Sequence, residues 1–354
     1  ADYLALCTSN LPTPAVIPSE HFNTVTYTGD TSYDRDITGV GFDPTLVSIK
    51  CTNYTYEYMW FDKIRGAGQR LYSHNNVAES TNTSTLNAFI TDGFTVGSGS
   101  GVDLSVNGSG RNYVSWNWKA NGTGSANTVG DIDSTVSVNT DAGFSIVSWT
   151  GTNTSGGQTI GHGLSSTPEM IITKRRNGAG AWYTYHSGMT DHGYELYLNL
   201  NNGQTASGQF QHAAPTSSVF TIYGAGALDG SGATYIAYCF HSVEGYSKLG
   251  VYDGNGNADG VFIYTGFRPA YVMFKDLDAL NDWAVLDNKR NTFNLMDKVL
   301  APSTNGTTYD YDSGIDFVSN GIKLRSSNGK WNDNNAPYIW IAFAETPFKY
   351  SNAR

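Results

Sequence analysis

The sequence contains little cysteine and little charge. Only three of its 354 residues are cysteine, at positions 7, 51 and 239. They are too few and too widely spaced for a disulfide framework or a zinc knuckle, so we expect free thiols. Charged residues make up 15% of the chain, and the formal net charge is -10. A scattered minority of Lys and Arg disfavours nucleic acid and anionic membrane surfaces as partners, because both require a basic face.

Long apolar runs are also missing. No segment approaches the ~18 apolar residues that a membrane-spanning helix needs. The sequence therefore predicts a soluble chain without membrane insertion.

The strong catalytic motifs are absent as well. The chain has no G-x-S-x-G, H-E-x-x-H, C-x-x-C, G-x-x-x-x-G-K or G-x-G-x-x-G. None of its glutamates recurs in the repeats described below, and Glu345 is interpreted as a solvated charge at a strand end. We therefore predict no enzyme activity, no catalytic residues and no cofactor, although a pair of carboxylates in a β fold is compatible with glycoside hydrolysis.

What the sequence has in abundance is glycine, tyrosine and small polar residues. It contains 40 glycines and 23 tyrosines, and 13% of the chain is aromatic. Short aromatic or β-branched runs between polar turns are typical of an all-β protein.

Internal repeats organise the chain. Residues 26–50 and 251–275 align without a gap, and residues 148–174 form a third copy that is two residues longer. Each copy is followed by a similar apolar run, YVSWNWKA, YIAYCFHS or YIWIAFAE. The intervals Tyr27 to Tyr113, Trp149 to Tyr235 and Tyr252 to Tyr338 are all 86 residues. The constant interval indicates that three units share one fold.

The three closing runs predict which side chains are buried, because strand side chains alternate between two faces. One face is large and apolar in every copy, and a Trp follows the shared Lys of each unit. The predicted structural core comprises Trp116, Trp118, Tyr238, Phe240, Ile341 and Phe343, with Trp60, Trp182 and Trp283. The other face is small and variable, so Cys239 is interpreted as a buried filler rather than a nucleophile.

Units of ~100 residues with alternating apolar runs are best satisfied by two packed antiparallel sheets. We predict three tandem antiparallel β-sandwich repeats, of jelly-roll or concanavalin-like type, at 22–120, 144–245 and 246–354. A lead segment at 1–21 precedes them. Residues 121–143, rich in Gly, Ser, Thr and Asn, are predicted to form a polar linker.

Residues 253–264 begin with the spacing of a calcium loop. The loop lacks glycine at its sixth position and Glu at its twelfth, so we predict a turn between strands. A different cation site that uses Asp253 and Asp259 is the alternative.

A charged pair with the same spacing occurs in two units, as Asp62 with Arg65 and Asp287 with Arg290. We interpret each as an ion pair that fixes a turn. His162, His186, His192 and His212 match no metal motif and are predicted to be polar surface residues.

Aromatic and amide side chains suit carbohydrate recognition, because aromatic rings stack on sugars and amides bind hydroxyls. The alternative is that these aromatics fill the cores and subunit contacts.

The strings AYCFHSVEGYSK (237–248) and TGFRPAYVM (265–273), with GFDPTLVSIK and AFAETPF, resemble repeat-containing virion structural proteins of tailed, especially marine, bacteriophages. The resemblance covers residues 3–348 and implies a tail fibre or appendage in the virion, without established catalytic residues. Host cell-surface polysaccharide or protein, other virion proteins and a homotrimer of the chain are the implied partners. A carbohydrate-binding module, a capsid decoration protein and a polysaccharide depolymerase are the alternatives.

Overall fold

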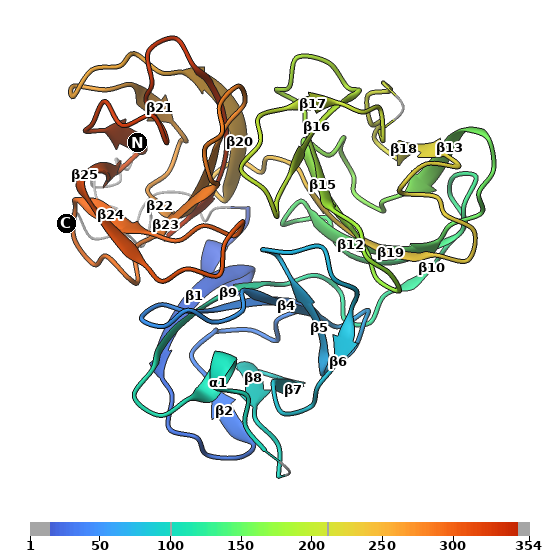
Figure 1. Cartoon of the computed structure of the whole chain (residues 1–354), viewed down its shortest axis with the longest axis horizontal. Coiled ribbons are helices and arrows are strands. Elements are labelled where there is room, and N and C mark those ends of the chain that lie inside the picture. Colours follow the sequence, from blue (N-terminus) through green and yellow to red (C-terminus); the bar gives the residue numbers. More distant parts are fainter. Residues whose placement is uncertain (1–14, 100, 211, 346–354) are drawn as a thin grey trace, which may run out of the picture.

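The protein is an antiparallel β protein, as the alternating runs predict. The computed structural model describes residues 15–99, 101–210 and 212–345. Cys7 and most of the predicted lead segment lie outside these residues. All hydrogen-bonded pairs among the named strands are antiparallel, and the sheets form three lobes around a common centre (Figure 1). None of the described helices is long and apolar enough to cross a membrane.

Lobe 1 has one large and one small sheet. The large sheet has the order β1-β9-β3-β4-β5-β6. Its strands are β1 (Phe22–Thr28), β3 (Leu46–Cys51), β4 (Met59–Asp62), β5 (Gln69–Tyr72), β6 (Ser80–Thr81) and β9 (Asn112–Trp118). The small sheet consists of β2 (Arg35–Ile37), β7 (Leu86–Ile90) and β8 (Gly93–Val96). The short helices are η2 (Pro18–Glu20) and α1 (Leu104–Asn107).

Lobe 2 contains the largest sheet, in the order β10-β11-β12-β19-β14-β15-β16-β17. Its strands are β10 (Ser125–Asn127), β11 (Ser134–Asn139), β12 (Phe144–Thr150), β14 (Met170–Arg175), β15 (Trp182–His186), β16 (Tyr194–Tyr197), β17 (Thr205–Ala206) and β19 (Thr234–Phe240). The small sheet pairs β13 (Gly156–Gly161) with β18 (Val219–Gly224).

Lobe 3 has two four-stranded sheets. The first, β20-β27-β22-β23, consists of β20 (Ser247–Asp253), β22 (Pro269–Asp276), β23 (Ala284–Asp287) and β27 (Pro337–Ala344). The second, β21-β26-β25-β24, consists of β21 (Phe262–Tyr264), β24 (Met296–Val299), β25 (Tyr309–Val318) and β26 (Gly321–Leu324).

The same four-strand arrangement faces the centre in every lobe: β1-β9-β3-β4, β12-β19-β14-β15 and β20-β27-β22-β23 (Figure 1). This arrangement explains the 86-residue interval, because its two ends are cross-strand partners with stacked rings. The ring centroids are 5.0 Å apart in Tyr27–Tyr113, 5.2 Å in Trp149–Tyr235 and 5.0 Å in Tyr252–Tyr338.

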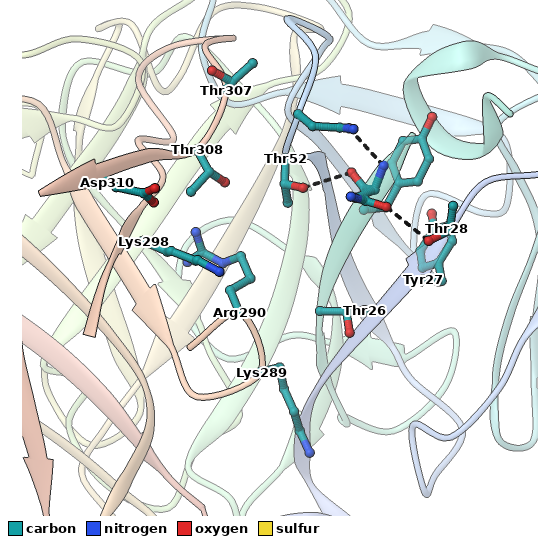
Figure 2. Close-up of a pocket in the computed structure, with 13 residues that line it drawn as sticks. Thr26, Tyr27, Thr28, Thr52, Lys289, Arg290, Lys298, Thr307, Thr308 and Asp310 are labelled. Atoms are coloured by element: carbon teal, nitrogen blue, oxygen red, sulfur yellow. Dashed lines mark hydrogen bonds between the residues drawn. The ribbon is translucent and has the colours of Figure 1, made fainter. Parts of the chain in front are cut away.

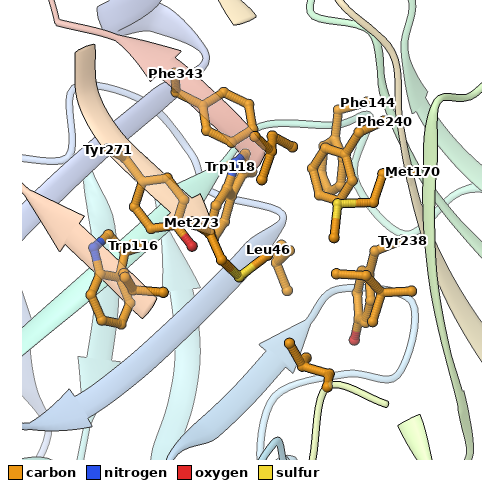
Figure 3. Close-up of a cluster of buried hydrophobic side chains, with 14 of the residues drawn as sticks. Leu46, Trp116, Trp118, Phe144, Met170, Tyr238, Phe240, Tyr271, Met273 and Phe343 are labelled. Atoms are coloured by element: carbon orange, nitrogen blue, oxygen red, sulfur yellow. The ribbon is translucent and has the colours of Figure 1, made fainter. Parts of the chain in front are cut away.

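The closing strands β9, β19 and β27 bury both faces, and this differs from the expectation of one core in each unit. All nine predicted core residues are buried, but they belong to a single cluster shared by the three lobes (Figure 3). The opposite face fills the separate interior of each lobe, with Cys239 in lobe 2 and Trp340 in lobe 3. The nine predicted core residues therefore hold the lobes together.

Three equivalent aromatic residues meet at the centre of this cluster. Trp118, Phe240 and Phe343 contact one another edge to face, with ring centroids 5.8 to 6.5 Å apart (Figure 3). Such pairs contribute about 0.5 to 1.5 kcal/mol beyond the burial of their area. Each lobe supplies one ring, so the lobes surround an approximate threefold axis within one chain.

The strand register corrects the equivalence of the three tryptophans. Trp182 pairs with Lys174, and the register of β22 with β23 places Trp283 opposite Lys275, but the residue opposite Lys50 is Tyr58. Trp60 lies two residues farther along β4. Trp60 therefore shares its residue type, but not its register position, with Trp182 and Trp283.

Residues 121–143 were predicted to be a linker, and the structure instead forms β10 and β11 there, paired with the lobe 2 sheet. Ile132 and Val136 of this segment are buried in the interior of lobe 2. Burial of these isolated apolar side chains stabilises strands in a segment whose composition alone is typical of a linker.

Candidate functional site

Three buried lysines connect the lobes in a cycle. The Nζ atom of Lys50 in lobe 1 donates to the Asn305 carbonyl of lobe 3, at 3.1 Å. The equivalent bonds are Lys174 to Asn76, at 3.2 Å, and Lys275 to Asn201, at 3.3 Å. Burial lowers the pKa of each ammonium group to about 8. Carbonyl oxygens, rather than carboxylates, thus receive these three desolvated charges.

The same cycle has a backbone component in three short segments, which we call straps 1, 2 and 3 (76–79, 201–204 and 305–308). The backbone N–H of the last residue in each strap donates to a carbonyl of the neighbouring lobe. The accepting residue lies two positions after the buried lysine of that neighbouring lobe. The bonds are Glu79 to Arg176 at 2.7 Å, Gln204 to Leu277 at 2.6 Å and Thr308 to Thr52 at 2.8 Å. Three head-to-tail contacts of one kind close a ring.

The two predicted ion pairs exist and are buried. Asp62 pairs with Arg65, and Asp287 pairs with Arg290 at 2.6 Å. Each carboxylate also accepts a hydrogen bond from the next lobe's closing strand. Tyr238 Oη donates to Asp62 at 2.8 Å, and Trp116 Nε1 donates to Asp287 at 3.2 Å. The pairs therefore fix contacts between lobes as well as turns.

Lobe 2 has His186 and Met189 at the corresponding positions. The closing-strand residue of lobe 3 that corresponds to Tyr238 and Trp116 is Ile341, which has no polar group to pair with a carboxylate. His186 is fully buried, and burial lowers its pKa to about 4. His186 and Met189 thus replace the ion pair at the contact where the neighbouring closing strand presents the apolar Ile341.

The other histidines of lobe 2 do not converge. His162 is buried like His186, which contradicts the predicted surface position of both. His192 contacts Tyr185, and His212 pairs with Asp191 at the surface, 2.8 Å apart. No group of three or more His, Cys, Asp or Glu side chains suited to a metal ion occurs in the described part of the chain.

The Asp253–Asp259 loop is built as a turn. Its side-chain amides bond to its own backbone, since Asn255 Oδ1 accepts from Asn257 N and Asn257 Oδ1 accepts from Asp259 N, each at 3.0 Å. The Asp259 carboxylate lies 2.7 Å from the ammonium group of Lys323. The carboxylate that the alternative prediction assigned to a cation is therefore paired with Lys323.

Cys51 and Cys239 are buried free thiols, as predicted for these two. Burial raises the pKa of the Cys239 thiol to about 12, which suits a filler rather than a nucleophile. Glu345 forms an ion pair with Arg268. Glu195 is buried, its carboxylate accepts hydrogen bonds from the hydroxyls of Tyr197 and Ser207, and burial raises the pKa of its carboxyl.

A groove opens between lobes 1 and 3 (Figure 2), with a volume of about 750 Å³. Hydroxyl groups line much of it, from Thr26, Thr28, Thr52, Thr307 and Thr308. Asn53 and Asn112 add amide groups and bond to each other, through Asn112 N and Asn53 Oδ1 at 2.9 Å. Such a surface can bind the hydroxyls of a ligand.

The lobe 3 side of this groove is cationic. Lys289, Arg290 and Lys298 line it, and Asp310 is the carboxylate among the described residues of the lining. Figure 2 shows the Arg290 guanidinium between the two lobes, near Thr308 and Lys298. In a chain with a net charge of -10, this is a local excess of positive charge suited to an anion.

Sequence reasoning missed the straps, the buried lysine cycle and the groove. The signal for the straps is weak: each begins with Asn, in NVAE, NNGQ and NGTT, 26 to 30 residues after the shared Lys. The groove joins Thr52 to Thr308, so only the ring closure brings its two walls together.

No curated protein and no solved structure matches the chain. A family model described as a domain of unknown function, DUF7483, matches residues 17–347. The matched span contains all three lobes and the groove. The chain therefore belongs to the DUF7483 family.

Proposed function

We propose that the chain is a structural protein of a phage virion, a tail-fibre-like appendage that displays loops for recognition of host cell-surface glycans. The observation that carries this proposal is the ring of equivalent contacts that closes within one chain. Head-to-tail closure buries each lobe's inner sheet and directs the small sheets outward (Figure 1). The result is a rigid body with three outward surfaces, as a non-catalytic binding appendage requires.

Exposed aromatic rings on these outward surfaces support the recognition role. Tyr33, beside β2, is 59% exposed, Tyr223 on β18 is 48% exposed, and Tyr264 on β21 is 58% exposed. Each lobe has at least one exposed aromatic ring among the described residues. Exposed tyrosines stack on sugar rings, whereas many of the other aromatic residues are buried in the core clusters.

The resemblance to phage virion proteins supplies the setting. Its most specific strings contribute Tyr238, Phe240, Tyr246 and Tyr271 to the cluster shared by the lobes. The strings thus coincide with residues that join the lobes. The homotrimer remains part of the proposal, and it would form through surfaces outside the ring, because the described inner sheets already pack against one another.

Immunogold electron microscopy of intact particles from the source tests the setting. Antibody raised against the folded chain is expected to label the tail. Label on the head would make the protein a capsid decoration protein, and particles without label would contradict the virion assignment. Particles that lack the gene product, labelled in parallel, control for antibody specificity.

A further inference from the structure

The ring symmetry is broken at the contact between lobes 3 and 1. Between lobes 1 and 2, the carboxylate of Glu79, at the end of strap 1, lies 2.9 Å from Arg176 and 3.3 Å from Arg65. Between lobes 2 and 3, Gln204 reaches Asp278 at 3.3 Å. The corresponding residue of strap 3 is Thr308, which is too short for such contacts. The groove lies at this contact.

Arg290 is left with an unmatched donor as a result. Its counterpart Arg65 uses Nη1 to donate to Gln69 O and Glu79 Oε2. Arg290 donates from Nε to Asp287 and from Nη2 to Val285 O, but its buried Nη1 has no hydrogen-bond partner among the described residues. Its side chain is 4% exposed. A buried donor without an acceptor is unfavourable, so this wall of the groove favours an added anion.

Two further features favour a ligand at this wall. The buried Oγ1 of Thr308 also has no partner within the described structure. Lys289 and Lys298 are exposed at the groove and form no ion pair within the described residues. Two lysines without an ion pair, and Arg290 with its free donor beside Asp287, thus face Asp310 on a surface that the described residues otherwise line with hydroxyls and amides.

We propose that this groove binds an acidic saccharide, and that a carboxylate of the sugar takes the place that Glu79 occupies in the contact between lobes 1 and 2. Arg290, Lys289 and Lys298 pair with the acid group, since guanidinium and ammonium groups bind carboxylates strongly. Threonine and asparagine side chains bind the ring hydroxyls. The choice of a saccharide rests on the proposed role in surface recognition, whereas the anionic character rests on the groove.

Isothermal titration calorimetry of the full chain with an oligogalacturonate hexamer tests this inference, with maltohexaose as the neutral probe. We expect the acidic hexamer to bind, and to bind more weakly as salt rises. The double variant Lys289→Glu/Lys298→Glu is expected to weaken binding by about tenfold or more, because it replaces attraction with repulsion. Lys119→Glu, at a lobe 1 lysine that is not among the residues that line the groove, is the control for charge reversal and retains binding.

Thr308→Glu provides a second test that does not remove a cation. By the ring symmetry, the new carboxylate fills the position of Glu79 and pairs with Arg290, so binding of the acidic hexamer is lost while the thermal midpoint is unchanged or higher. Thr308→Gln fills the same space without charge. Stronger inhibition by Glu than by Gln supports the placement of the acid group.

Equal affinity for the two hexamers, no binding of the acidic one, or full binding by both groove variants would overturn the inference. These outcomes are separable from the virion assignment. Tail label without groove-dependent binding removes only the inference, and groove-dependent binding without particle label removes only the virion assignment.

Discussion

Single residues decide how each lobe meets its neighbour. Asp62 and Asp287 accept hydrogen bonds from Tyr238 and Trp116 of the adjacent closing strands. His186 replaces the carboxylate where the adjacent strand presents an apolar residue. Buried charges are tolerated at these positions because each carboxylate is paired with an arginine and accepts a further hydrogen bond from the neighbouring lobe.

Removal of one partner of such a pair is expected to be costly. Asp287→Ala leaves the Arg290 charge buried without its partner, so we expect a loss of about 3 to 5 kcal/mol in the free energy of unfolding. The double variant Asp287→His/Arg290→Met reproduces the lobe 2 residues and removes the charge. Urea denaturation should show a smaller loss for the double variant than for the single one; an equal or larger loss would contradict this account.

Because His186 is buried, we expect the free energy of unfolding to depend on pH in the acidic range. Its folded-state pKa of about 4 lies below the reference value of 6.5, so its contribution to stability is present above pH 6.5 and is lost as the pH falls toward 4. The loss amounts to on the order of 3 kcal/mol for a shift of this size.

His186→Gln removes the titrating group and should reduce the fall in unfolding free energy between pH 7 and pH 4.5, measured by urea denaturation. His212→Gln, at an exposed histidine of the same lobe, is the control. A fall in the His186→Gln variant as steep as in the wild type would show that other groups carry the acid dependence.

At the scale of elements, short straps join the lobes where strands do not. The three straps make the same backbone bond to the neighbouring lobe, although their side chains differ. The main chain therefore maintains the ring, and the side chains at the last strap position determine whether the contact is closed, as with Glu79, or open, as with Thr308.

Strap 2 approaches its neighbour closely. A Cβ atom on Gly203 would lie 2.6 Å from the Leu277 carbonyl oxygen. Gly203→Ala must therefore displace the strap from lobe 3, and we expect a loss of about 1 to 3 kcal/mol in stability. Gly306→Ala in strap 3 has room, because its nearest neighbour is Thr304 Oγ1 at 3.4 Å. Equal decreases in the thermal midpoint of the Gly203→Ala and Gly306→Ala variants would contradict this explanation.

At the scale of the whole molecule, one apolar cluster serves all three lobes. Trp118, Phe240 and Phe343 come from different lobes and lose their packing together if one lobe unfolds. The lobes are therefore coupled, unlike units joined by flexible linkers.

This coupling predicts a single cooperative unfolding transition. Differential scanning calorimetry of the full chain should give a calorimetric enthalpy close to the van't Hoff enthalpy, as expected for a two-state process. Separate transitions, or a ratio of the two enthalpies near three, would mean that the lobes unfold independently. Phe343→Ala should lower the midpoint of that one transition, because it opens a cavity in the shared cluster, at a cost of about 3 to 5 kcal/mol.

The sequence was sufficient for the all-β class, for the constant 86-residue interval and for the burial of residues such as Trp116 and Phe240, because alternation and repetition can be read along the chain. The pairing behind that interval came from the structure. It could not show that these residues face a neighbouring lobe, since a buried face looks the same whichever partner covers it. The equivalence of Tyr58 with Trp182 depends on strand register. The groove joins Thr52 to Lys298 across the ring closure, and contacts between residues so far apart in sequence arise only when the three lobes pack around their common axis.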